Sequence, residues 1–492
     1  MNQIRIASRK SPLARMQSYA VGAALQAAQP GLKIEYLFKE SLGDKNLTDP
    51  LWKMPERGVF TEDFVQDLLN ESADLVVHSW KDLPTEPRPG LSLLGTLPRA
   101  DTRDLLFFRP ASLGKKNLTL LTSSPRRTFS AENHLKPLLP FAVDSIETKT
   151  VRGNVNTRIR KLIEGEGDGL FMAKAALDRL LATTAEEFAE ARAELRAYVD
   201  QLNWMVLPLS LFPTAPAQGA LAIEAKTGRT ELAELVAMIH CPATEAAVRR
   251  ERALFSSFGG GCHQKIGLTV AAHPRFGNLE FFYGHHAGET KHFIRADSAP
   301  APLPVNATRW PLNQTQAFFE REAISAEHPG TDLFVARANA LPAGWKLGRE
   351  TVFTAGIETW RKLAERGVWV HGTTDGLGET LPHVEALAGR APNFTKLTHD
   401  RSGNDGVFPR MLATYRLVPR EGFAPPVVDA YFWSSYSTFE RALELNPKIR
   451  DASHATGPGH TAIAVEKALG RPVAVYINYR HWKDGDPCAN ES

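Results

Sequence analysis

Side chains that can carry or exchange a proton gather directly after a short apolar run near residue 75. The run itself, residues 75–77, predicts a buried strand, and Pro84 ends any further strand pairing. The side chains that follow it are His78, Ser79, Lys81 and Asp82. Polar groups at the carboxyl end of a buried strand lie where open α/β sheets bind their ligands. From spacing alone two interpretations stay open: a ligand site, or an ordinary solvated turn.

Basic side chains recur at the predicted strand-to-helix turns. They are Arg9, Lys10, Arg126, Arg127 and Arg152. Backbone N–H groups at a helix start favour a bound anion, and guanidinium groups pair bidentately with carboxylates. A ligand with several carboxylates fits these basic turns, and a phosphate-rich ligand fits their charge almost as well. An ordinary basic surface that binds no ligand is the third alternative. The sequence has no Gly-x-x-x-x-Gly-Lys-Ser/Thr loop, and these turns lack Gly-x-Gly-x-x-Gly, which argues against a nucleotide.

The elements that must position these groups predict two α/β lobes. Up to Asp82 the pattern is strand, helix, strand, helix, strand, which predicts a parallel sheet with right-handed crossovers. The pattern restarts after Pro98, and residues 217–224 predict a strand that returns to the first lobe. We therefore expect lobe 1 at residues 1–97 and 212–228 and lobe 2 at residues 98–211, with an anionic ligand in the cleft between them.

Three further regions follow from composition and pattern. A small α+β domain is expected at 229–300, where three consecutive glycines before Cys262 can present its thiol to a cleft; a buried, inert cysteine is the alternative. Alanine and proline enrichment predicts a linker at 301–325, followed by α/β structure at 326–485. The loop at 43–58 has no clear period and is a candidate lid.

The composition is that of a globular protein. Its 492 residues suffice for three or four domains, with 43% hydrophobic and 23% charged residues. The net charge of +3 is too small for this length to indicate a nucleic-acid or membrane partner. Three irregularly spaced cysteines fit neither a disulfide framework nor a Cys-based zinc site and indicate a reducing compartment. With no signal-peptide pattern and no apolar run of roughly 20 residues, we expect a cytoplasmic protein.

Six short motifs occur in one order along residues 3–300. They are Ala-Ser-Arg-Lys-Ser-Pro-Leu-Ala (7–14), His-Ser-Trp-Lys-Asp-Leu-Pro (78–84), Thr-Ser-Ser-Pro-Arg-Arg (122–127), Arg-Gly-Asn-Val-Asn-Thr-Arg (152–158), Gln-Gly-Ala (218–220) and Gly-Gly-Gly-Cys (259–262). Each is weak alone, but together they make the chain resemble hydroxymethylbilane synthase, also called porphobilinogen deaminase. Leu42, Arg57 and Pro125 depart from the family pattern and bear on lid behaviour and affinity rather than on reaction type.

The resemblance implies a reaction and a set of site residues. Members of that family join four porphobilinogen units into hydroxymethylbilane with loss of ammonia, on a dipyrromethane cofactor held by a thioether. By resemblance, Cys262 carries the cofactor and Asp82 is the catalytic carboxylate. The implied further cofactor contacts are Lys81, Ser124, Arg126, Arg127 and Arg152, and the implied substrate contacts are Arg9, Ser11, Lys53, Arg57, Phe60, Arg158 and Gln218. The resemblance also implies two periplasmic-binding-protein-like lobes, no metal, porphobilinogen as the small-molecule partner, and a monomer.

The C-terminal region predicts two related α/β lobes. A strand followed by a helix recurs before and after residue 428, and the repeat loosely resembles uroporphyrinogen-III synthase, which closes the linear tetrapyrrole with inversion of its last ring. The resemblance implies a second site with Ser435, Tyr436 and Thr461. Ordinary helix caps and turns, or a degenerate lobe with only a structural role, are the alternatives.

A rival hypothesis covers the N-terminal lobes as well. Two α/β lobes with arginines in the cleft also describe a non-catalytic binding protein for a carboxylate-rich ligand. The two hypotheses differ in whether Cys262 carries pyrrole units and whether porphobilinogen is consumed.

Overall fold

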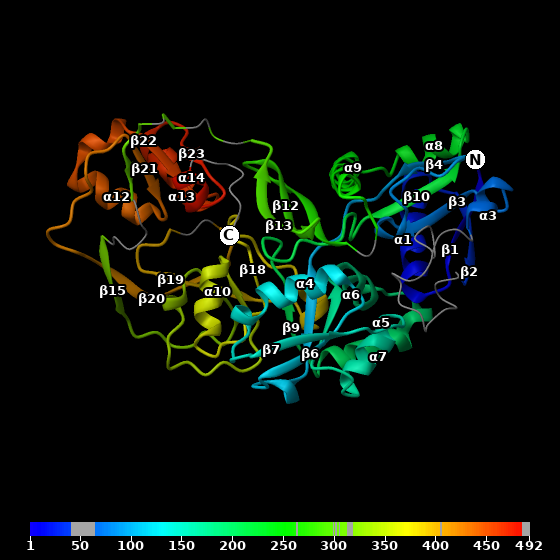
Figure 1. Ribbon diagram of the computed structural model, residues 1–492, viewed down its shortest axis with the longest axis horizontal. Helices are drawn as coiled ribbons and strands as arrows, with labels where there is room; N and C mark the ends of the chain where they lie inside the picture. Colours follow the sequence, from blue (N-terminus) through cyan, green and yellow to red (C-terminus); the bar gives the residue numbers. More distant parts are fainter. Residues whose placement is uncertain are drawn as a thin grey trace. The chain divides into compact units, whose positions relative to one another are not determined.

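The computed structural model describes residues 1–40, 64–261, 264–298, 300, 303–304, 306–311, 318–403 and 406–484 (Figure 1). Lys53, Arg57, Phe60 and Cys262 lie outside the described residues, as does the candidate lid at 43–58. The chain divides into two compact units. Unit 1 is Met1–Lys136, Ala142–Val270 and Phe281–Lys291; unit 2 is Pro137–Phe141, Ala271–Glu280 and His292–Ser492.

The first lobe of unit 1 is a five-stranded sheet in the order β2-β1-β3-β10-β4. Its strands are β1 (Gln3–Arg9), β2 (Lys33–Lys39), β3 (Leu75–Ser79), β4 (Leu91–Gly95) and β10 (Leu221–Lys226). The apolar face of helix α1 (Pro12–Ala28) packs on β1 through Val21 and Leu25, both completely buried. Because β1 and β3 are parallel neighbours, Arg9 at the end of β1 and the residues after β3 come to the same edge.

The second lobe of unit 1 repeats this design in the order β7-β6-β8-β5-β9. Its strands are β5 (Asp104–Phe108), β6 (Asn117–Leu121), β7 (Ser145–Lys149), β8 (Gly169–Ala173) and β9 (Asn203–Val206), and its helices are α4 (Pro125–His134), α5 (Val155–Ile163), α6 (Lys174–Ala182) and α7 (Ala189–Val199). Helices α4 and α5 start after the parallel strands β6 and β7, which brings the basic turns at 126–127 and 152 to one edge.

The two sheets share one topology. In each, three parallel strands lie in the order second, first, third, followed by an antiparallel strand, β10 or β5, and then by the fourth strand. Two segments, 96–103 and 207–220, connect the lobes. The expected periplasmic-binding-protein-like lobes are confirmed, as is the return of the strand near 217–224 to lobe 1.

A small α+β region completes unit 1 and contributes to unit 2. It contains helices α8 (Thr230–Ala237) and α9 (Pro242–Ser257) and the sheet β11-β12-β13, with β11 (Lys265–His273), β12 (Gly277–His286) and β13 (Glu289–Ala296). Helix α9 buries Val248 against Trp80, Ala217 and Ala220 of the first lobe. This contact places one face of α9 directly behind the turn that follows β3.

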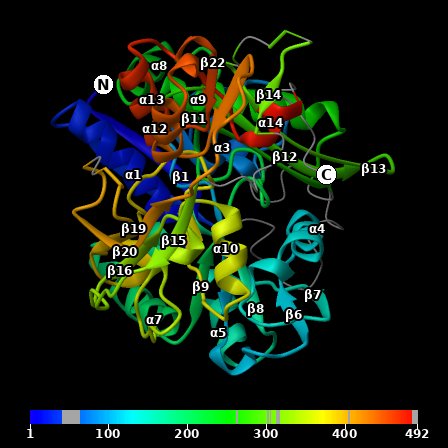
Figure 2. The same ribbon diagram turned by 90° about the vertical axis from the view of Figure 1, so that its left-hand side faces the viewer.

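Unit 2 contains two α/β sheets, several of whose strands are labelled in Figure 2. In chain order, the strands of the six-stranded sheet lie between β14 and β21 of the four-stranded sheet. The six-stranded sheet has the order β15-β20-β19-β16-β17-β18, with β15 (Phe319–Ala323), β16 (Asp332–Val335), β17 (Val352–Thr354), β18 (Gly372–Thr373), β19 (Phe394–His399) and β20 (Arg410–Pro419). The parallel four-stranded sheet has the order β14-β21-β22-β23, with β14 (Arg309–Trp310), β21 (Ala430–Trp433), β22 (Ser453–Thr456) and β23 (Ala474–Val475). Strands β14 and β15 fall within 301–325, the range predicted as a linker.

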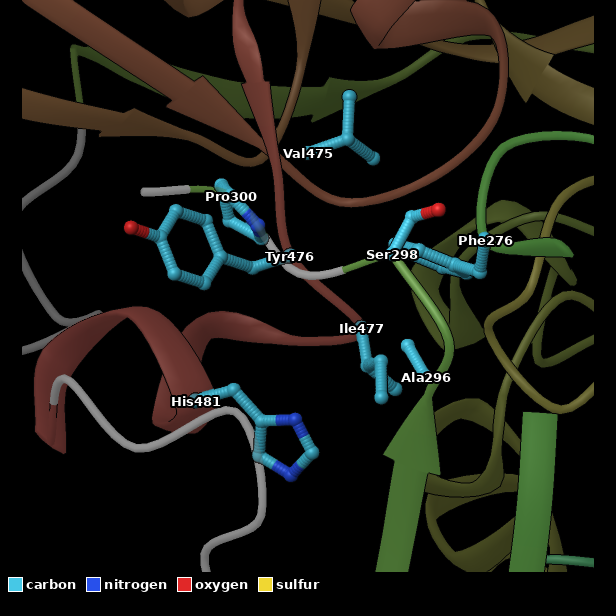
Figure 3. Close-up of a pocket in the computed structure, with 8 residues that line it drawn as sticks. All are labelled: Phe276, Ala296, Ser298, Pro300, Val475, Tyr476, Ile477 and His481. Atoms are coloured by element: carbon cyan, nitrogen blue, oxygen red, sulfur yellow. The ribbon is translucent and has the colours of Figure 1, made fainter. Parts of the chain in front are cut away.

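The helices that accompany these sheets in the described part of unit 2 are α10 (Ile357–Ala364), α11 (Glu385–Ala388), α12 (Tyr436–Leu445), α13 (His460–Leu469) and α14 (Tyr479–Asp484). A pocket beside α14 is lined by Phe276, Ala296, Ser298, Pro300, Val475, Tyr476, Ile477 and His481 (Figure 3). Its lining is almost wholly apolar, so the pocket does not suit a ligand with several carboxylates.

The described residues offer neither a membrane-spanning helix nor a metal-binding cluster. None of their helices combines the length and the apolar character that crossing a bilayer requires. They also contain no group of three or more His, Cys, Asp or Glu side chains suited to hold a metal ion.

Candidate functional site

Asp82 lies on a single 3-10 turn, Trp80–Asp82, directly after β3. The backbone N–H of Trp80 donates to Ala220 O at 3.0 Å, and the buried indole anchors the turn in the core of lobe 1. The Asp82 side chain is half-buried and forms no hydrogen bond or ion pair with another residue that the structure describes. Its position is thus fixed through the backbone, while its carboxylate stays available to a ligand.

Arg252 of α9 holds this turn from behind. Its Nη1 donates to Leu83 O at 3.1 Å and to Trp80 O at 3.4 Å, and its Nη2 donates to Pro84 O. Burial lowers the pKa of Arg252 to about 10, with the charge of Glu224 acting in the opposite direction. The guanidinium therefore stays charged at neutral pH and pins the carbonyls on both sides of Asp82.

His78 and Ser79 point to structural partners instead. His78 Nε2 lies 3.1 Å from Glu224 Oε2, and Gln17 Nε2 donates to Ser79 Oγ at 2.9 Å. Burial opposes ionisation of Glu224, but the hydrogen bond from His78 and the charge of Arg88 hold the pKa of Glu224 below its usual value. Of the four polar residues that follow the apolar run, only Lys81 and Asp82 remain for a ligand.

Lys81 extends toward the second lobe. Its Nζ donates to Gln218 Oε1 at 3.3 Å, and Gln218 Nε2 donates in turn to Asp104 Oδ1 at 2.8 Å. The side chain has surface open to solvent, yet protein atoms crowd around its ammonium group. This crowding lowers the pKa of Lys81, opposed by the charge of Asp82. Lys81 is thus accessible to a ligand but poorly hydrated, which favours pairing with an anion.

Arg126 and Arg127 share one buried carboxylate. Arg126 Nη1 lies 2.9 Å from Asp104 Oδ2, and Arg127 Nη2 lies 2.7 Å from Asp104 Oδ1. Burial opposes ionisation of Asp104, but the two guanidinium groups hold its pKa far below the usual range. Ser124 caps α4 by accepting a hydrogen bond from Arg127 N at 3.4 Å. One carboxylate neutralises only one of the two arginines, so the pair keeps a net positive charge.

Arg158 is the least compensated of the cations. Its Nε donates to Gly153 O at 2.7 Å, and it forms no ion pair with a carboxylate in the described part of the chain. Burial, together with the charges of Arg127, Arg152 and Arg9 and against the opposing charge of Asp82, lowers the pKa of Arg158 to about 10. Burial and the charge of Arg9 likewise lower the pKa of Arg152. These side chains therefore share one electrostatic neighbourhood with Asp82.

The charges of this neighbourhood do not balance among the described residues. Four cations, Lys81, Arg126, Arg127 and Arg158, share this neighbourhood with two carboxylates, Asp82 and Asp104. Arg9 and Arg152, which have further contacts of their own, add to the same positive field. Ser11, at the start of α1, leaves its hydroxyl free of any capping hydrogen bond. A ligand that brings several carboxylates would relieve the repulsion among the cations. The donor set therefore fits a dipyrromethane, whose acetate and propionate side chains are anionic at neutral pH.

The glycine loop before Cys262 approaches the Asp82 turn. Gly259, Gly260 and Gly261 all have positive φ angles, +88°, +60° and +97°, which other residues rarely adopt. A Cβ added to Gly260 would lie 3.5 Å from Oγ1 of Thr85, three residues after Asp82. The backbone just before residue 262 thus lies beside the segment that carries the carboxylate.

Sequence reasoning did not identify the residues that tie the lobes together. Arg99 pairs bidentately with Glu251 of α9 at 2.7 and 2.9 Å, and the completely buried Glu251 also accepts hydrogen bonds from Ala217 N and Val270 N. Arg99 and Ala217 belong to the two segments that connect the lobes. Only a glutamate on an otherwise apolar helix face hinted at this role.

The C-terminal candidates lie at helix starts. Ser435 caps α12, where its Oγ accepts a hydrogen bond from Thr438 N at 3.4 Å, and Tyr436 is the first residue of that helix. Thr461 lies in the first turn of α13. No hydrogen bond between described residues joins Thr461 to Ser435 or Tyr436, so the structure does not bring the three together through direct contacts.

Comparisons with known proteins concern the N-terminal part of the chain. The chain is 35% identical to a porphobilinogen deaminase of Chloroherpeton thalassium over 290 residues, which is 58% of this chain and 82% of that protein. It is 30% identical over 324 residues to a probable porphobilinogen deaminase of Pyrobaculum islandicum, covering 65% of this chain and 100% of that protein. A solved periplasmic domain of BvgS from Bordetella pertussis matches 52% of this chain and 92% of its own at 12% identity, with a TM-score of 0.26; the lobe assignment above depends on the strand orders and not on this match.

A match to a family model adds which domain of that family the chain contains. Residues 4–234 match the model described as "Porphobilinogen deaminase, dipyromethane cofactor binding domain". This range contains Asp82 and every described cation of the cleft. Together with identities of 35% and 30% across most of each relative's length, it establishes that the chain belongs to the porphobilinogen deaminase family and that its N-terminal lobes form a dipyrromethane-cofactor-binding domain.

Proposed function

We propose that the chain is a hydroxymethylbilane synthase, which joins four porphobilinogen molecules with release of ammonia in tetrapyrrole biosynthesis. The observation that carries the proposal is the free carboxylate of Asp82, held on a rigid turn amid a surplus of cations and beside the glycine loop of the predicted cofactor cysteine. The similarity to proteins described as porphobilinogen deaminases supports the same activity. We also infer a cytoplasmic monomer.

Asp82 supplies the acid and the counter-charge that the reaction requires. When porphobilinogen loses the nitrogen of its aminomethyl group as ammonia, the C–N bond breaks and the remaining carbon becomes cationic. A carboxylate beside the pyrrole N–H groups can hold the proton that the departing amine needs, and its negative charge then stabilises the cation. Asp82 has no competing partner among the described residues, so it is free for both tasks.

The cations supply binding and orientation. The acetate and propionate groups of the dipyrromethane would be held by Lys81, Ser124, Arg126, Arg127 and Arg152. When bound, the dipyrromethane offers the pyrrole carbon to which new units are attached. The same groups of the substrate would be held by Arg9, Ser11, Arg158 and Gln218, together with Lys53, Arg57 and Phe60, which lie outside the described residues. Bidentate guanidinium contacts would fix the plane of each carboxylate and so orient its pyrrole ring.

Cys262 is the proposed thioether anchor. It follows Gly260 by two residues in the sequence, and the backbone at Gly260 lies beside Thr85. Asp82→Asn tests the catalytic role: we expect an intact fold and nearly complete loss of porphobilinogen consumption. Near-normal turnover would remove Asp82 from the mechanism.

The rival function, a non-catalytic binding protein for a carboxylate-rich ligand, has a clear signature. It predicts a purified chain without pyrrole units and no consumption of porphobilinogen. Colorimetric assay of residual porphobilinogen, with Asp82→Asn as the matched blank, separates it from the synthase.

For the C-terminal region we propose a uroporphyrinogen-III synthase-like role, in which the linear product is closed with inversion of its last ring. Its support is the arrangement of unit 2 as two α/β sheets with Ser435, Tyr436 and Thr461 at helix starts. Chromatography of the oxidised porphyrin product tests it. We expect the full chain, with no other enzyme added, to yield isomer III. If isomer I is the only product, the C-terminal region has a structural role and does not direct ring closure.

A further inference from the structure

The six-stranded sheet of unit 2 has a topological switch point between β16 and β19. From β16 the chain proceeds to β17 and β18 on one side, whereas from β19 it proceeds to β20 on the other. All these neighbouring pairs are parallel. Connections that leave two adjacent strands in opposite directions open a crevice outside their carboxyl ends, and open α/β sheets bind ligands there.

Basic groups stand at this switch point. Arg337 follows the end of β16 by two residues, and His399 is the last residue of β19. Arg337 Nη2 donates to the backbone O of Ser434 at 3.3 Å, directly after β21 of the other sheet. The carboxyl edge of the four-stranded sheet therefore forms the opposite wall of the crevice.

His399 presents a hydrogen-bond donor. Its Nδ1 accepts the backbone N–H of Arg401 at 3.2 Å, so the proton of the neutral ring must be on Nε2. Tyr415, paired with His399 across β19 and β20, has its ring centroid 5.7 Å from the imidazole. The hydroxyl of Tyr415 lies within hydrogen-bonding reach of Asn339 and Arg321. Donors from three strands, β15, β19 and β20, thus converge on the same place as Arg337.

The positive charge here is compensated only in part. Arg321 and Arg337 form no ion pair with a carboxylate among the described residues. Lys396 is neutralised by Glu379. Asp400 keeps its negative charge while its Oδ1 accepts the backbone N–H of Leu417 at 3.1 Å, so it offsets at most one of the two guanidinium groups.

The pKa values of His399 and Arg337 reflect their burial and the positive charges around them. Burial lowers the pKa of His399 to about 4, with Arg337, Lys396 and Arg321 acting in the same direction and Asp400 against it. Burial also lowers the pKa of Arg337, with Arg321 adding to it and Tyr415 opposing it. At neutral pH the imidazole is therefore a neutral donor beside two cations, which suits an incoming anion.

We propose that this crevice, defined by Arg321, Arg337, His399 and Tyr415, is a second anion-binding site that takes a carboxylate of a polycarboxylate ligand. Two guanidinium groups with an imidazole N–H and a phenol can grip a planar carboxylate from several directions. The choice of a tetrapyrrole as the bearer of that carboxylate depends on the proposed function; the site itself does not.

Uroporphyrin I, a stable octacarboxylate, is the probe. Binding to the full chain is measured by calorimetry, and hydrogen exchange with and without the probe locates the protected peptides. We expect protection at 332–340 and 394–401, and a loss of affinity of about tenfold or more for the unit 2 site in Arg337→Gln. Arg321→Gln, at an exposed strand position that tolerates substitution, is expected to weaken the same site.

The control is Arg361→Gln, which removes an equal charge from α10 of unit 2, where Arg361 pairs with Glu358 three residues away. Unchanged binding in both crevice variants, an equal loss in Arg361→Gln, or protection confined to unit 1 would overturn the proposal. So would inorganic phosphate that protects the same peptides while uroporphyrin does not, because the site would then take a small phosphate. Porphobilinogen consumption by the unaltered chain tests the proposed function separately. The proposed function and the proposed anion-binding site can therefore be refuted independently of each other.

Discussion

Arg252→Met tests how Asp82 is held in place. Arg252 is the positioning residue on α9 whose guanidinium donates to the carbonyls of Trp80, Leu83 and Pro84, which flank Asp82. Methionine keeps most of the side chain's apolar length and removes all three donors. A hydrogen bond from a charged group contributes about 1.5–3 kcal/mol. Since Arg252 is only half-buried and water can replace part of what is lost, we expect a loss of about 2 kcal/mol in the free energy of unfolding.

The larger effect is expected on turnover. Without the clamp the turn keeps its Trp80 anchor but gains freedom at Leu83 and Pro84, and a displacement of about 1 Å can cost a reaction about a hundredfold. We therefore expect kcat for porphobilinogen consumption to fall by about ten- to a hundredfold. KM should change much less, because Lys81 and the cleft arginines that bind carboxylates stay in place.

Two variants make this result specific. Arg252→Lys keeps one charged donor and should recover part of kcat. Arg249→Gln lies on the same helix, removes an exposed arginine paired with Glu245, and should leave kcat and KM unchanged. Normal kcat in Arg252→Met, an equal loss in Arg249→Gln, or a rise in KM alone would refute the reasoning. A midpoint of thermal unfolding above the assay temperature confirms that each variant is folded during the assay.

Three more perturbations test the site and unit 2. Asp104→Asn leaves Arg126 and Arg127 buried without their carboxylate and should destabilise the protein by about 3–5 kcal/mol in denaturant titration, whereas exposed Asp144→Asn should not; equal midpoints would contradict this. Gly260→Val forces a branched side chain onto a φ of +60° beside Thr85, so intact mass should reveal a smaller fraction of pyrrole-bearing chain, and full loading would show that the loop tolerates it. Burial lowers the pKa of His371 to about 4 from 6.5, so between these pH values the unfolded chain takes up a proton that the folded chain refuses; stability should fall as pH drops through this window and less so in His371→Gln, and parallel curves would refute the assignment.

The sequence predicted the elements that carry the site because their signals are local. The apolar run at 75–77 and the prolines at the starts of α1 and α4 each fix a strand or a helix within a few residues. Once the strands are parallel, their ends and the turns that follow must share an edge. That is why Arg9, Asp82 and Arg152 could be grouped without a structure.

Long-range pairing was beyond local patterns. Asp104 comes 22 residues before Arg126, and Arg252 comes 170 residues after Asp82, so no spacing rule connects them. The same holds for His78, whose polar neighbours suggested a ligand until Glu224 of β10 proved to lie 3.1 Å away. In the range predicted as a linker, β14 has only two residues, too few for any periodicity, and β15 carries alternating charges on an exposed edge.

The intact mass of the purified full chain tests the central claim most directly. The account predicts a mass above that of the sequence by two linked pyrrole units, retained in Cys241→Ala and absent from Cys262→Ala. An unmodified mass in the unaltered chain, together with no consumption of porphobilinogen, would contradict it.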